Sequence, residues 1–368
     1  MSERPLIGFY METAFHYDVY KNIILALQAS GHACALVISD VIEASFVKEM
    51  VEKVKTLRHP DLPVFTLSKL VSERVVLPCM VSPYYTPLLK GRARHHVRAL
   101  YGLAKDRWGH AWWNTFYDLI LCYGDHTQEK LNIAGTAVTV GNPRFDDWHN
   151  LRYDRSLVQA LGRNRKKPVV LYAPTFGELC SVPHWAEQLN ALQSRCTLLI
   201  RLHHGTRLRP SEAASRALVD RYFRKNIVSG AGAFPLLEAA DMVLTDNSGF
   251  LFDAIHAGKR TVLLEWPGLK ALLESDRTLS DLHSAEQQAR KKIETAGSLK
   301  TLQTLLENQS SYRVPDELTV FRQRYCDKFQ DGKAGGRAAT AIADLLTRPT
   351  PVNFYLHSLR EQLFNTRA

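Results

Sequence analysis

The stretch from Asp241 to Gly268, DMVLTDNSGFLFDAIHAGKRTVLLEWPG, decides the fold of this chain. Its apolar runs Met242–Leu244 and Thr261–Leu264 are typical of buried strands, and Phe250–Ala257 between them has helical spacing. Gly258 follows as the glycine that commonly ends a helix. In this order the elements predict a β-α-β unit with two parallel strands.

The polar turn between the first strand and the helix is a candidate seat for phosphate groups. It reads Thr245-Asp246-Asn247-Ser248-Gly249. A helix that starts directly after a strand points free N–H groups at the carboxyl edge of the sheet, where α/β folds hold phosphates. We therefore expect Ser248 and the backbone around Gly249 to contact a diphosphate, with an ordinary polar turn as the alternative.

Strands and helices alternate through the whole chain of 368 residues, in two successive blocks. This alternation predicts an α/β fold with mainly parallel sheets, and the length suits two domains. We expect two Rossmann-like domains that face one another across a cleft, at 1–150 and 151–346. The remaining tail, 347–368, mixes aromatic and basic residues, which predicts either an amphipathic surface helix or a helix packed on the N-terminal domain.

Composition narrows the class of protein. The net charge of +10 favours polyanions, anionic lipid or phosphorylated substrates. No zinc-finger spacing and no RNA-recognition motif is present, so no nucleic-acid partner is expected. No apolar run is long enough to span a bilayer, and the first residues lack the pattern of a secretory signal. The six scattered cysteines indicate reduced core residues in a cytosolic protein.

Candidate binding residues follow two strands of the second block. Arg201, His203 and His204 come after the strand Thr197–Leu202, where a histidine can contact a phosphate or exchange a proton. Thr175 follows the strand Pro168–Tyr172 and is a candidate donor to a phosphate or a base. The alternatives are a surface loop and a strand-ending turn.

The first block carries its own candidates. His16 follows the first strand and is either a catalytic base or an ordinary loop histidine. The stretch from Tyr84 to Trp113 interleaves basic residues with tryptophan, which suits a membrane headgroup region or a solvated helix. Arg144 lies in the turn Gly141–Asp146, where it either binds an anion or pairs with Asp146.

Five motifs in sequence order resemble those of the CDP-glycerol glycerophosphotransferases, the family of teichoic-acid and capsule enzymes. The resemblance covers roughly residues 75–345 and implies a GT-B fold, with an acceptor-side N-terminal domain and a nucleotide-donor C-terminal domain. The motifs are G-x-P-R-x-D at Gly141–Asp146, L-Y-A-P-T at Leu171–Thr175, R-x-H at Arg201–His203, T-D-x-S-x-x-x-F-D at Thr245–Asp253 and D-G-K-A-x-x-R at Asp331–Arg337.

The resemblance implies roles for donor-side residues. Ser248 matches a serine that binds donor phosphate, and Gly249 stands where a second serine is common. His203 matches the histidine of R-x-H-P, with His204 in place of the proline. Asp246 and Asp253 match acidic positions on either side of the serine. Together with Thr175, Arg201 and Asn247, these residues form the expected donor site.

One departure concerns the acceptor side. The family usually carries H-G-T-P-L-K, whereas this chain reads Tyr84-Tyr85-Thr86-Pro87-Leu88-Leu89-Lys90. Tyr84 therefore stands at the position of the suspected base, and a phenol is a poor base at neutral pH. Thr86, Lys90 and Arg144 remain acceptor-side candidates, and the alternatives for the base are His16, His95 and His96.

The expected reaction is direct displacement at phosphorus. An acceptor hydroxyl attacks the glycerol-linked phosphorus of a CDP-alditol and CMP leaves, while Ser248 and a protonated His203 stabilise negative charge. No metal or other cofactor is expected. The acceptor is a glycan or glycolipid, at the inner face of the plasma membrane if the protein is peripheral. The rival hypotheses are a GT-B glycosyltransferase for a UDP- or CMP-sugar and a non-catalytic paralogue that binds glycan or membrane.

Overall fold

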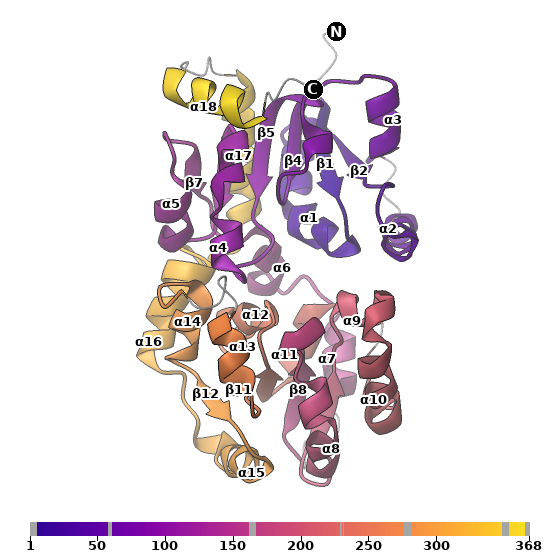
Figure 1. Cartoon of the computed structure of the whole chain (residues 1–368), viewed down its shortest axis with the longest axis vertical. Helices are drawn as coiled ribbons and strands as arrows, with labels where there is room; N and C mark the ends of the chain where they lie inside the picture. The colour runs from indigo at the N-terminus through magenta and orange to yellow at the C-terminus, as the bar shows by residue number, and fades with distance from the viewer. Residues whose placement is uncertain are drawn as a thin grey trace. The chain divides into compact units, whose positions relative to one another are not determined.

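The computed structural model describes residues 6–57, 61–161, 167–228, 230, 232–275, 281–347 and 353–364. The chain forms two compact units (Figure 1). Unit 1 comprises Met1–Tyr101, His110–Asn150 and Gln323–Ala368, and unit 2 comprises Gly102–Gly109 and Leu151–Arg322. Compared with the domains expected from the sequence, the segment from Gln323 onward clusters with unit 1, and Gly102–Gly109 clusters with unit 2.

Unit 1 is built on a seven-stranded sheet with the order β3-β2-β1-β4-β5-β6-β7, in which every neighbouring pair is parallel. The chain runs outward from β1 to β3 and then returns to β4 on the other side of β1. The point between β1 and β4 is therefore the topological switch point, where open parallel sheets bind ligands. The strands are β1 (Leu6–Met11), β2 (Ala33–Ile38), β3 (Val64–Thr66), β4 (Leu77–Ser82), β5 (Ala93–Ala99), β6 (Leu119–Cys122) and β7 (Ala137–Thr139).

Two helices from opposite ends of the chain complete the core of unit 1. Helix α1 (Ala14–Ala29) packs on α17 (Ala334–Thr347), and both contribute to one hydrophobic cluster with the central strands. A Cβ atom on Gly335 would lie 2.6 Å from the carbonyl oxygen of Asn22, so only glycine permits this close approach. The other helices are α2 (Ala44–Leu57), α3 (Leu67–Ser72), α5 (Asp125–Leu131), α6 (Asp146–His149) and α18 (Phe354–Phe364).

The tail helix α18 packs on unit 1, which is one of the two arrangements expected from the sequence. The Arg360 guanidinium donates to the Asp118 carboxylate at 2.7 Å and to two backbone carbonyls. The ring of Phe364 lies 5.0 Å from that of Tyr85 between centroids. At the start of the same helix, Phe354 and Tyr355 are 79% and 71% exposed, so one end of α18 keeps an aromatic surface.

Unit 2 contains a five-stranded parallel sheet with the order β12-β11-β10-β8-β9. Its switch point lies between β8 and β10. All five residues of β8 and of β11 are buried, as expected for strands covered by helices on both faces. The strands are β8 (Val169–Ala173), β9 (Thr197–Ile200), β10 (Met242–Thr245), β11 (Arg260–Leu264) and β12 (Glu294–Ala296).

Helices surround the sheet of unit 2 (Figure 1). The β-α-β unit expected from Asp241–Gly268 is confirmed as β10, α12 and β11. The helices are α4 (Asp106–Gly109), α7 (Arg155–Leu161), α8 (Val182–Leu192), α9 (His204–Leu208), α10 (Ala213–Phe223), α11 (Ala233–Ala239), α12 (Phe250–His256), α13 (Leu269–Ser275), α14 (Ala285–Arg290), α15 (Leu299–Glu307) and α16 (Asp316–Phe321).

The basic and aromatic stretch of the first block is not a solvated helix. Its residues Ala93–Ala99 form strand β5, and Arg98 is only 2% exposed. The guanidinium of Arg98 donates to the carbonyl of Pro83 and lies over the ring of Trp113 at 4.5 Å. Trp112 remains 57% exposed. The stretch therefore contains a strand that is buried toward its end, where Pro83 and Trp113 hold the Arg98 guanidinium, while Arg94 near its start is exposed.

Two further expectations concern membranes and thiols. In the described part of the chain, no helix combines the length and the hydrophobicity that crossing a membrane requires. Each of the six cysteines is buried and carries a free thiol, as expected from their scattered spacing.

Candidate functional site

The carboxyl edge of the unit 2 sheet gathers most of the residues predicted for the donor. Thr175 follows β8, Arg201 to His204 follow β9, and Asp246 to Gly249 follow β10. These strands are neighbours in the order β10-β8-β9, so their following loops lie side by side at the switch point. The position is the one where open α/β sheets bind nucleotides.

Asp246 is the structural centre of this edge. Its Oδ1 accepts a hydrogen bond from the backbone N–H of Thr175 at 2.8 Å. Its Oδ2 accepts from the N–H of Ser181 at 2.8 Å and from the Ser181 hydroxyl at 2.7 Å. The side chain is fully buried, and burial raises the pKa of Asp246 to about 6 despite these bonds. Its position predicts a role in holding the loop after β8.

Ser248 and Asn247 occupy the turn before α12. The Ser248 hydroxyl accepts from the N–H of Phe250, the first residue of α12, at 3.2 Å, and its own proton can be donated to another partner. The amide oxygen of Asn247 accepts from the guanidinium of Arg290, the last residue of α14. A cation from a distant part of the sequence is thereby fixed beside the predicted phosphate turn.

A second group of side chains follows β9. The ring of His203 stacks on Phe176 with 4.7 Å between centroids and lies 4.0 Å from the ring of His204. The Nδ1 of His203 accepts from the N–H of Gly205 at 3.0 Å, so a neutral ring carries its proton on Nε2. A Cβ on Gly205 would come within 2.7 Å of the Phe176 ring, so glycine is needed for this stack.

Several cations surround these rings. Burial lowers the pKa of His203 to about 2, and His204 and Arg201 act in the same direction. Lys105 and Arg209 contribute further to this lowering. Burial likewise lowers the pKa of His204 to about 4. Both histidines are therefore neutral at pH 7 in the ligand-free protein. The protonated His203 expected from the sequence would require a bound anion to offset the surrounding positive charge.

The segment Gly102–Gly109 brings Lys105 into unit 2. Its backbone N–H donates to the Glu286 carboxylate, and the N–H of Ala285 donates to Asp106 at 3.0 Å. The Cβ of Ala104 lies 3.8 Å from the position that a Cβ on Gly249 would take. Burial raises the pKa of Glu286 to about 7. This segment is therefore anchored to α14 and lies beside the turn of α12.

The remaining donor-side predictions fall on the same edge. Gly249 is exposed directly before α12, and Asp253 lies in the first turn of that helix. The guanidinium of Arg201 lies 5.2 Å from the ring of Phe250, so Arg201 reaches the same turn from β9. The sequence analysis did not identify four further residues of this edge, because they lie outside the motifs and no local pattern marks them: Lys105, Arg209, Glu286 and Arg290.

A second cluster occupies the switch point of unit 1. Glu12 follows β1 and Tyr84 follows β4, and these two strands are paired neighbours. The Tyr84 hydroxyl donates to Glu12 Oε2 at 2.5 Å, and the Tyr10 hydroxyl donates to Glu12 Oε1 at 2.5 Å. Burial and the carboxylate of Glu12 raise the pKa of Tyr84 far above its ordinary value. Tyr84 is therefore a hydrogen-bond donor and not a base.

His16 belongs to the same cluster. Its ring lies 5.8 Å from that of Tyr84 and 5.7 Å from that of Tyr101, both edge to face. The N–H of Glu12 donates to His16 Nδ1 at 3.1 Å, so a neutral His16 carries its proton on Nε2. His16 and Tyr84, predicted separately from the sequence, are thus brought together. Neither Glu12 nor Tyr101 was singled out there, although Glu12 is the first polar residue after an apolar strand.

The other candidate bases lie inside a strand. His95 and His96 belong to β5, four and three residues before its end. His95 lies 3.8 Å from the Asp118 carboxylate, and burial lowers the pKa of His96 to about 4. His96 packs on Phe116 at 4.2 Å between ring centroids. Their positions favour structural roles over that of a base in a loop.

Thr86, Lys90 and Arg144 are the remaining acceptor-side candidates. Thr86 precedes the 3₁₀ turn Pro87–Leu89, and Lys90 follows it and is exposed. Arg144 is 7% exposed, with its guanidinium 5.2 Å from the ring of Phe15. Their acceptor roles stay predictions.

Two of the family-like motifs interlock inside unit 1. The Asp146 carboxylate accepts from the N–H groups of Ala334 and Gly335 at 2.9 and 2.7 Å. The Arg337 guanidinium pairs with both oxygens of Asp331 and donates to the carbonyl of Val140 at 2.7 Å. The motifs at 141–146 and 331–337 therefore tie helix α17 to the end of the unit 1 sheet.

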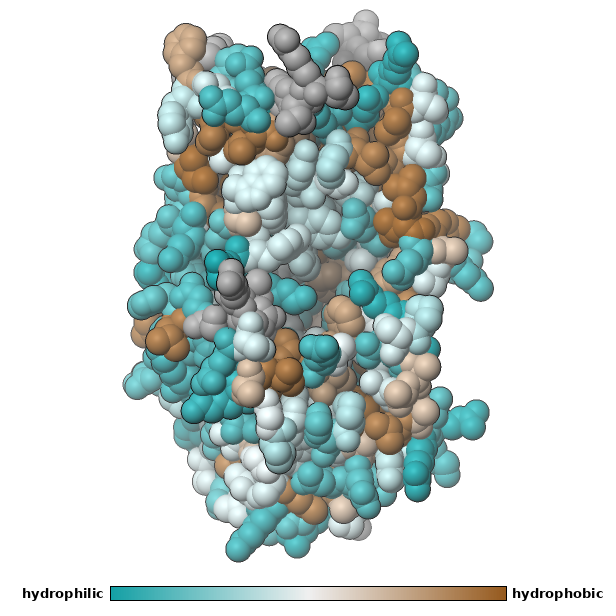
Figure 2. Space-filling model, viewed as in Figure 1, coloured by the Kyte–Doolittle hydropathy of each residue, from teal (hydrophilic) through white to brown (hydrophobic). Residues whose placement is uncertain are grey.

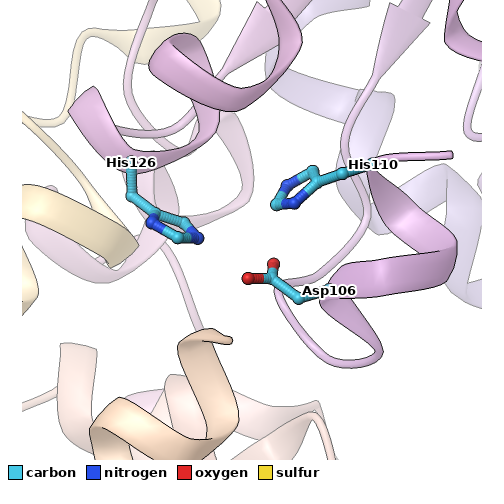
Figure 3. A group of neighbouring side chains, drawn as sticks. All are labelled: Asp106, His110 and His126. Carbon is cyan, nitrogen blue, oxygen red and sulfur yellow. The ribbon is translucent and has the colours of Figure 1, made fainter. Parts of the chain in front are cut away.

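Unit 1 also contains a pair of histidines that the sequence analysis did not single out. The rings of His110 and His126 lie 5.6 Å apart between centroids (Figure 3). His126 is 3% exposed and stacks on Tyr325 at 4.4 Å. The expectation that no metal is required stays a prediction.

A family model described as CDP-glycerol:poly(glycerophosphate) glycerophosphotransferase matches residues 127–344, which is more than half of the chain. None of the curated protein sequences matches the chain.

Three solved structures that share the fold are a teichoic acid polymerase, an epimerase and a UDP complex. The wall teichoic acid polymerase TagF is 14% identical with a TM-score of 0.60, covering 98% of this chain and 90% of TagF. A putative UDP-N-acetylglucosamine 2-epimerase from Listeria monocytogenes is 14% identical with a TM-score of 0.61, covering 94% and 98%. The S. aureus MnaA–UDP complex is 13% identical with a TM-score of 0.57, covering 95% and 100%. The expected α/β fold of the GT-B type is confirmed.

Proposed function

Because the chain belongs to the CDP-glycerol:poly(glycerophosphate) glycerophosphotransferase family, and is thus an enzyme of the glycerophosphotransferase type, we propose a specific reaction for it. The enzyme transfers glycerol phosphate, or a related alditol phosphate, from a CDP-activated donor to a hydroxyl of a glycan or glycolipid. CMP is the leaving group. TagF, which shares the fold, has been studied as a variant with CDPG, and this supports the choice of donor.

The observation that carries the proposal is the cluster of cations at the carboxyl edge of the unit 2 sheet. Arg201, which precedes the turn before α12 in the sequence, and Arg290, which follows it, both contact residues at this turn. Lys105 and Arg209 lower the pKa of His203, which places their positive charge close to the same rings. A diphosphate would offset this mutual repulsion, since phosphate oxygens are the natural partners of fixed cations.

The proposed chemistry needs positioning and charge neutralisation. The acceptor oxygen forms a bond to the glycerol-linked phosphorus as the bond from that phosphorus to the CMP oxygen breaks. Ser248 and His203 each donate to phosphate oxygens. The Ser248 oxygen already accepts the N–H of Phe250, which leaves its own O–H to donate, and His203 Nδ1 accepts the N–H of Gly205, which leaves its Nε2–H to donate. The proton of the acceptor hydroxyl leaves through a base on the acceptor side.

We further propose that the product belongs to a cell-surface polymer such as teichoic acid or capsule, and that the enzyme works at the inner face of the plasma membrane. In Figure 2 the visible face of unit 1 carries larger groups of hydrophobic residues than that of unit 2. Trp112, Phe354 and Tyr355 are exposed on unit 1, and the chain carries a net charge of +10. Stronger binding to anionic than to neutral vesicles, measured by sedimentation, would support this location, and equal binding would contradict it.

The donor is tested by calorimetry with CDP-glycerol, CDP-ribitol, CMP, UDP and UDP-N-acetylglucosamine. The proposal predicts binding that selects cytidine nucleotides. Selective binding of uridine nucleotides would contradict it and favour the rival glycosyltransferase hypothesis. Absence of binding to every nucleotide would favour the non-catalytic alternative.

Two variants test the residues. Ser248→Ala should lower the rate of CMP release by about 100-fold, as for the loss of one oriented donor to the reacting group. Ser298→Ala is the matched control, because the Ser298 hydroxyl also accepts a backbone N–H at the start of a helix, that of Thr301 in α15. Equal activity of the two variants would contradict the role of Ser248.

For the histidine, His203→Asn keeps a side-chain acceptor for the N–H of Gly205 but removes the Nε2–H donor. We expect a loss of CMP release of similar size with little change in thermal stability. His357→Asn, an exposed histidine of α18, serves as the control. Wild-type turnover in His203→Asn would show that the ring has no part in the reaction.

A further inference from the structure

The unit 1 sheet places a carboxylate at its own switch point, and nothing in the sequence motifs assigns it a role. Glu12 follows β1, beside the loop that begins after β4. Its side chain is partly exposed, whereas His16 and Tyr10 next to it are buried. The carboxylate is therefore held by buried neighbours while part of the residue remains in contact with solvent.

The hydrogen bonds fix the orientation of this carboxylate. Each oxygen accepts one phenol, Tyr10 on Oε1 and Tyr84 on Oε2, both at 2.5 Å. Because an ionised carboxylate offers about four acceptor positions, two phenols leave capacity for another hydroxyl. Burial and Glu12 raise the pKa of both phenols far above the ordinary value, so they remain protonated donors.

The neighbouring rings limit what can approach. Tyr84, Tyr101 and His16 meet pairwise, with centroids 5.7 to 5.8 Å apart and edge-to-face geometry. Arg98 holds the loop after β4, because its guanidinium donates to the carbonyl of Pro83. A hydroxyl at the uncharged end of a polyol chain suits this setting, whereas a phosphate would be repelled by the carboxylate.

We propose that Glu12 is the catalytic base of the acceptor side, and that it takes the proton of a terminal polyol hydroxyl. This inference rests on the proposed phosphoryl transfer. As the acceptor O–H bond breaks, its oxygen bonds to the glycerol-linked phosphorus, and the bond from that phosphorus to the CMP oxygen breaks with its electron pair. The proton moves to the Glu12 carboxylate and is later released to water.

His16 and Tyr84 take supporting roles in this arrangement. His16 Nδ1 accepts the N–H of Glu12 and thereby orients the backbone that carries the carboxylate. Tyr84, which stands at the expected position of a basic histidine, donates to the carboxylate. Glu12 thus supplies the proton acceptor that the substitution by tyrosine removes.

The test compares Glu12→Gln with wild type, using CDP-glycerol and a short poly(glycerol phosphate) chain that ends in a free glycerol hydroxyl. We expect kcat to fall about 100-fold or more with little change in KM, since general base catalysis contributes that much. Binding of CDP-glycerol, measured by calorimetry, should be unchanged. Glu52→Gln in α2, an exposed carboxylate paired with Lys55, is the matched control and should keep full activity.

Tyr84→Phe provides a readout that a merely structural role would not change. The groups that interact with Glu12 are phenols and one histidine: Tyr10 on β1, His16 and Tyr20 on α1, Tyr84 after β4, Tyr101 after β5 and Tyr117 before β6. Removing the Tyr84 hydroxyl takes away one of the two phenols that orient the carboxylate and leaves the ring in place. We therefore expect kcat to fall while KM for the acceptor changes little.

The outcomes separate the two proposals. A Glu12→Gln variant with kcat within about threefold of wild type, or an unchanged kcat in Tyr84→Phe, would overturn the role of Glu12 and leave the proposed function intact. A wild-type enzyme that neither binds CDP-glycerol nor releases CMP would overturn the proposed function, and the role of Glu12 with it.

Discussion

The Asp246 carboxylate accepts a hydrogen bond from the backbone N–H of Thr175 at 2.8 Å, and so ties the loop after β10 to the loop after β8. Both loops begin at the switch point of the unit 2 sheet, and both carry residues of motifs that resemble the family. Because Asp246 is fully buried and already accepts three hydrogen bonds, it acts as a structural link beside the turn that we predict to bind phosphate.

Asp246→Ala should destabilise the protein by about 3 kcal/mol, since three buried donors lose their acceptor at about 1 kcal/mol or more each. Chemical denaturation measures the loss. Ser181→Ala removes one of the three bonds to Asp246 and also the bond between the Ser181 and Tyr172 hydroxyls, so it should cost about 2 kcal/mol. Similar stability of Asp246→Ala and wild type would show that the link between the loops does not carry this energy.

Gly205→Ala should weaken donor binding. The new Cβ would lie 2.7 Å from the ring of Phe176, which stacks on His203, so the ring must move. We expect at least a tenfold rise in the Kd for CDP-glycerol, measured by calorimetry. Gly297→Ala, where nothing lies within 4 Å of the added Cβ, is the control. Unchanged binding by Gly205→Ala would mean that the position of this ring is unimportant.

Glu286 gives the stability of unit 2 a pH dependence of known sign. Burial raises the pKa of Glu286 to about 7, so the folded protein holds this proton where the unfolded chain releases it. The free energy of unfolding should therefore decrease as the pH rises from about 4.5 to about 7. Glu286→Gln should remove this contribution, about 3 kcal/mol at pH 8, while its amide oxygen still accepts the N–H of Lys105.

Urea denaturation of wild type and Glu286→Gln between pH 5 and pH 8 measures the difference. The two curves should separate as the pH rises, with the variant more stable at the alkaline end. Parallel curves would show that the carboxyl group ionises in the folded protein as it does in the unfolded chain. Glu178→Gln, an exposed carboxylate of the same unit, is the control.

The sequence predicts the β-α-β unit of Met242–Leu264 better than the strand β5, and the reason is physical. The unit from Met242 to Leu264 has strong local signals, because its strands are apolar and its polar turn is short. The strand β5 was missed because Arg94, His95, His96 and Arg98 give it a polar composition, and its burial depends on partners such as Asp118 and Asn114. Local patterns do not contain such partners.

Long-range placement explains the other omissions. Arg290 and Lys105 come from segments far from the turn Thr245–Gly249 in the sequence. Arg290 is held by Asn247 of that turn, and the backbone of Lys105 is held by Glu286. Glu12 becomes a candidate only when β1 and β4 are known to be neighbours, since that pairing brings Tyr84 to its carboxylate. Motifs locate strand ends, whereas the sheet order decides which of those ends form one site.

The most direct test of the central claim follows the phosphorus atoms. The enzyme is mixed with CDP-glycerol and a short poly(glycerol phosphate) acceptor, and the reaction is observed by phosphorus NMR. We predict that the diphosphate signals of the donor disappear while the signals of CMP and of a new phosphodiester appear together. A donor that remains intact, or that yields free glycerol phosphate without a new phosphodiester, would contradict the account.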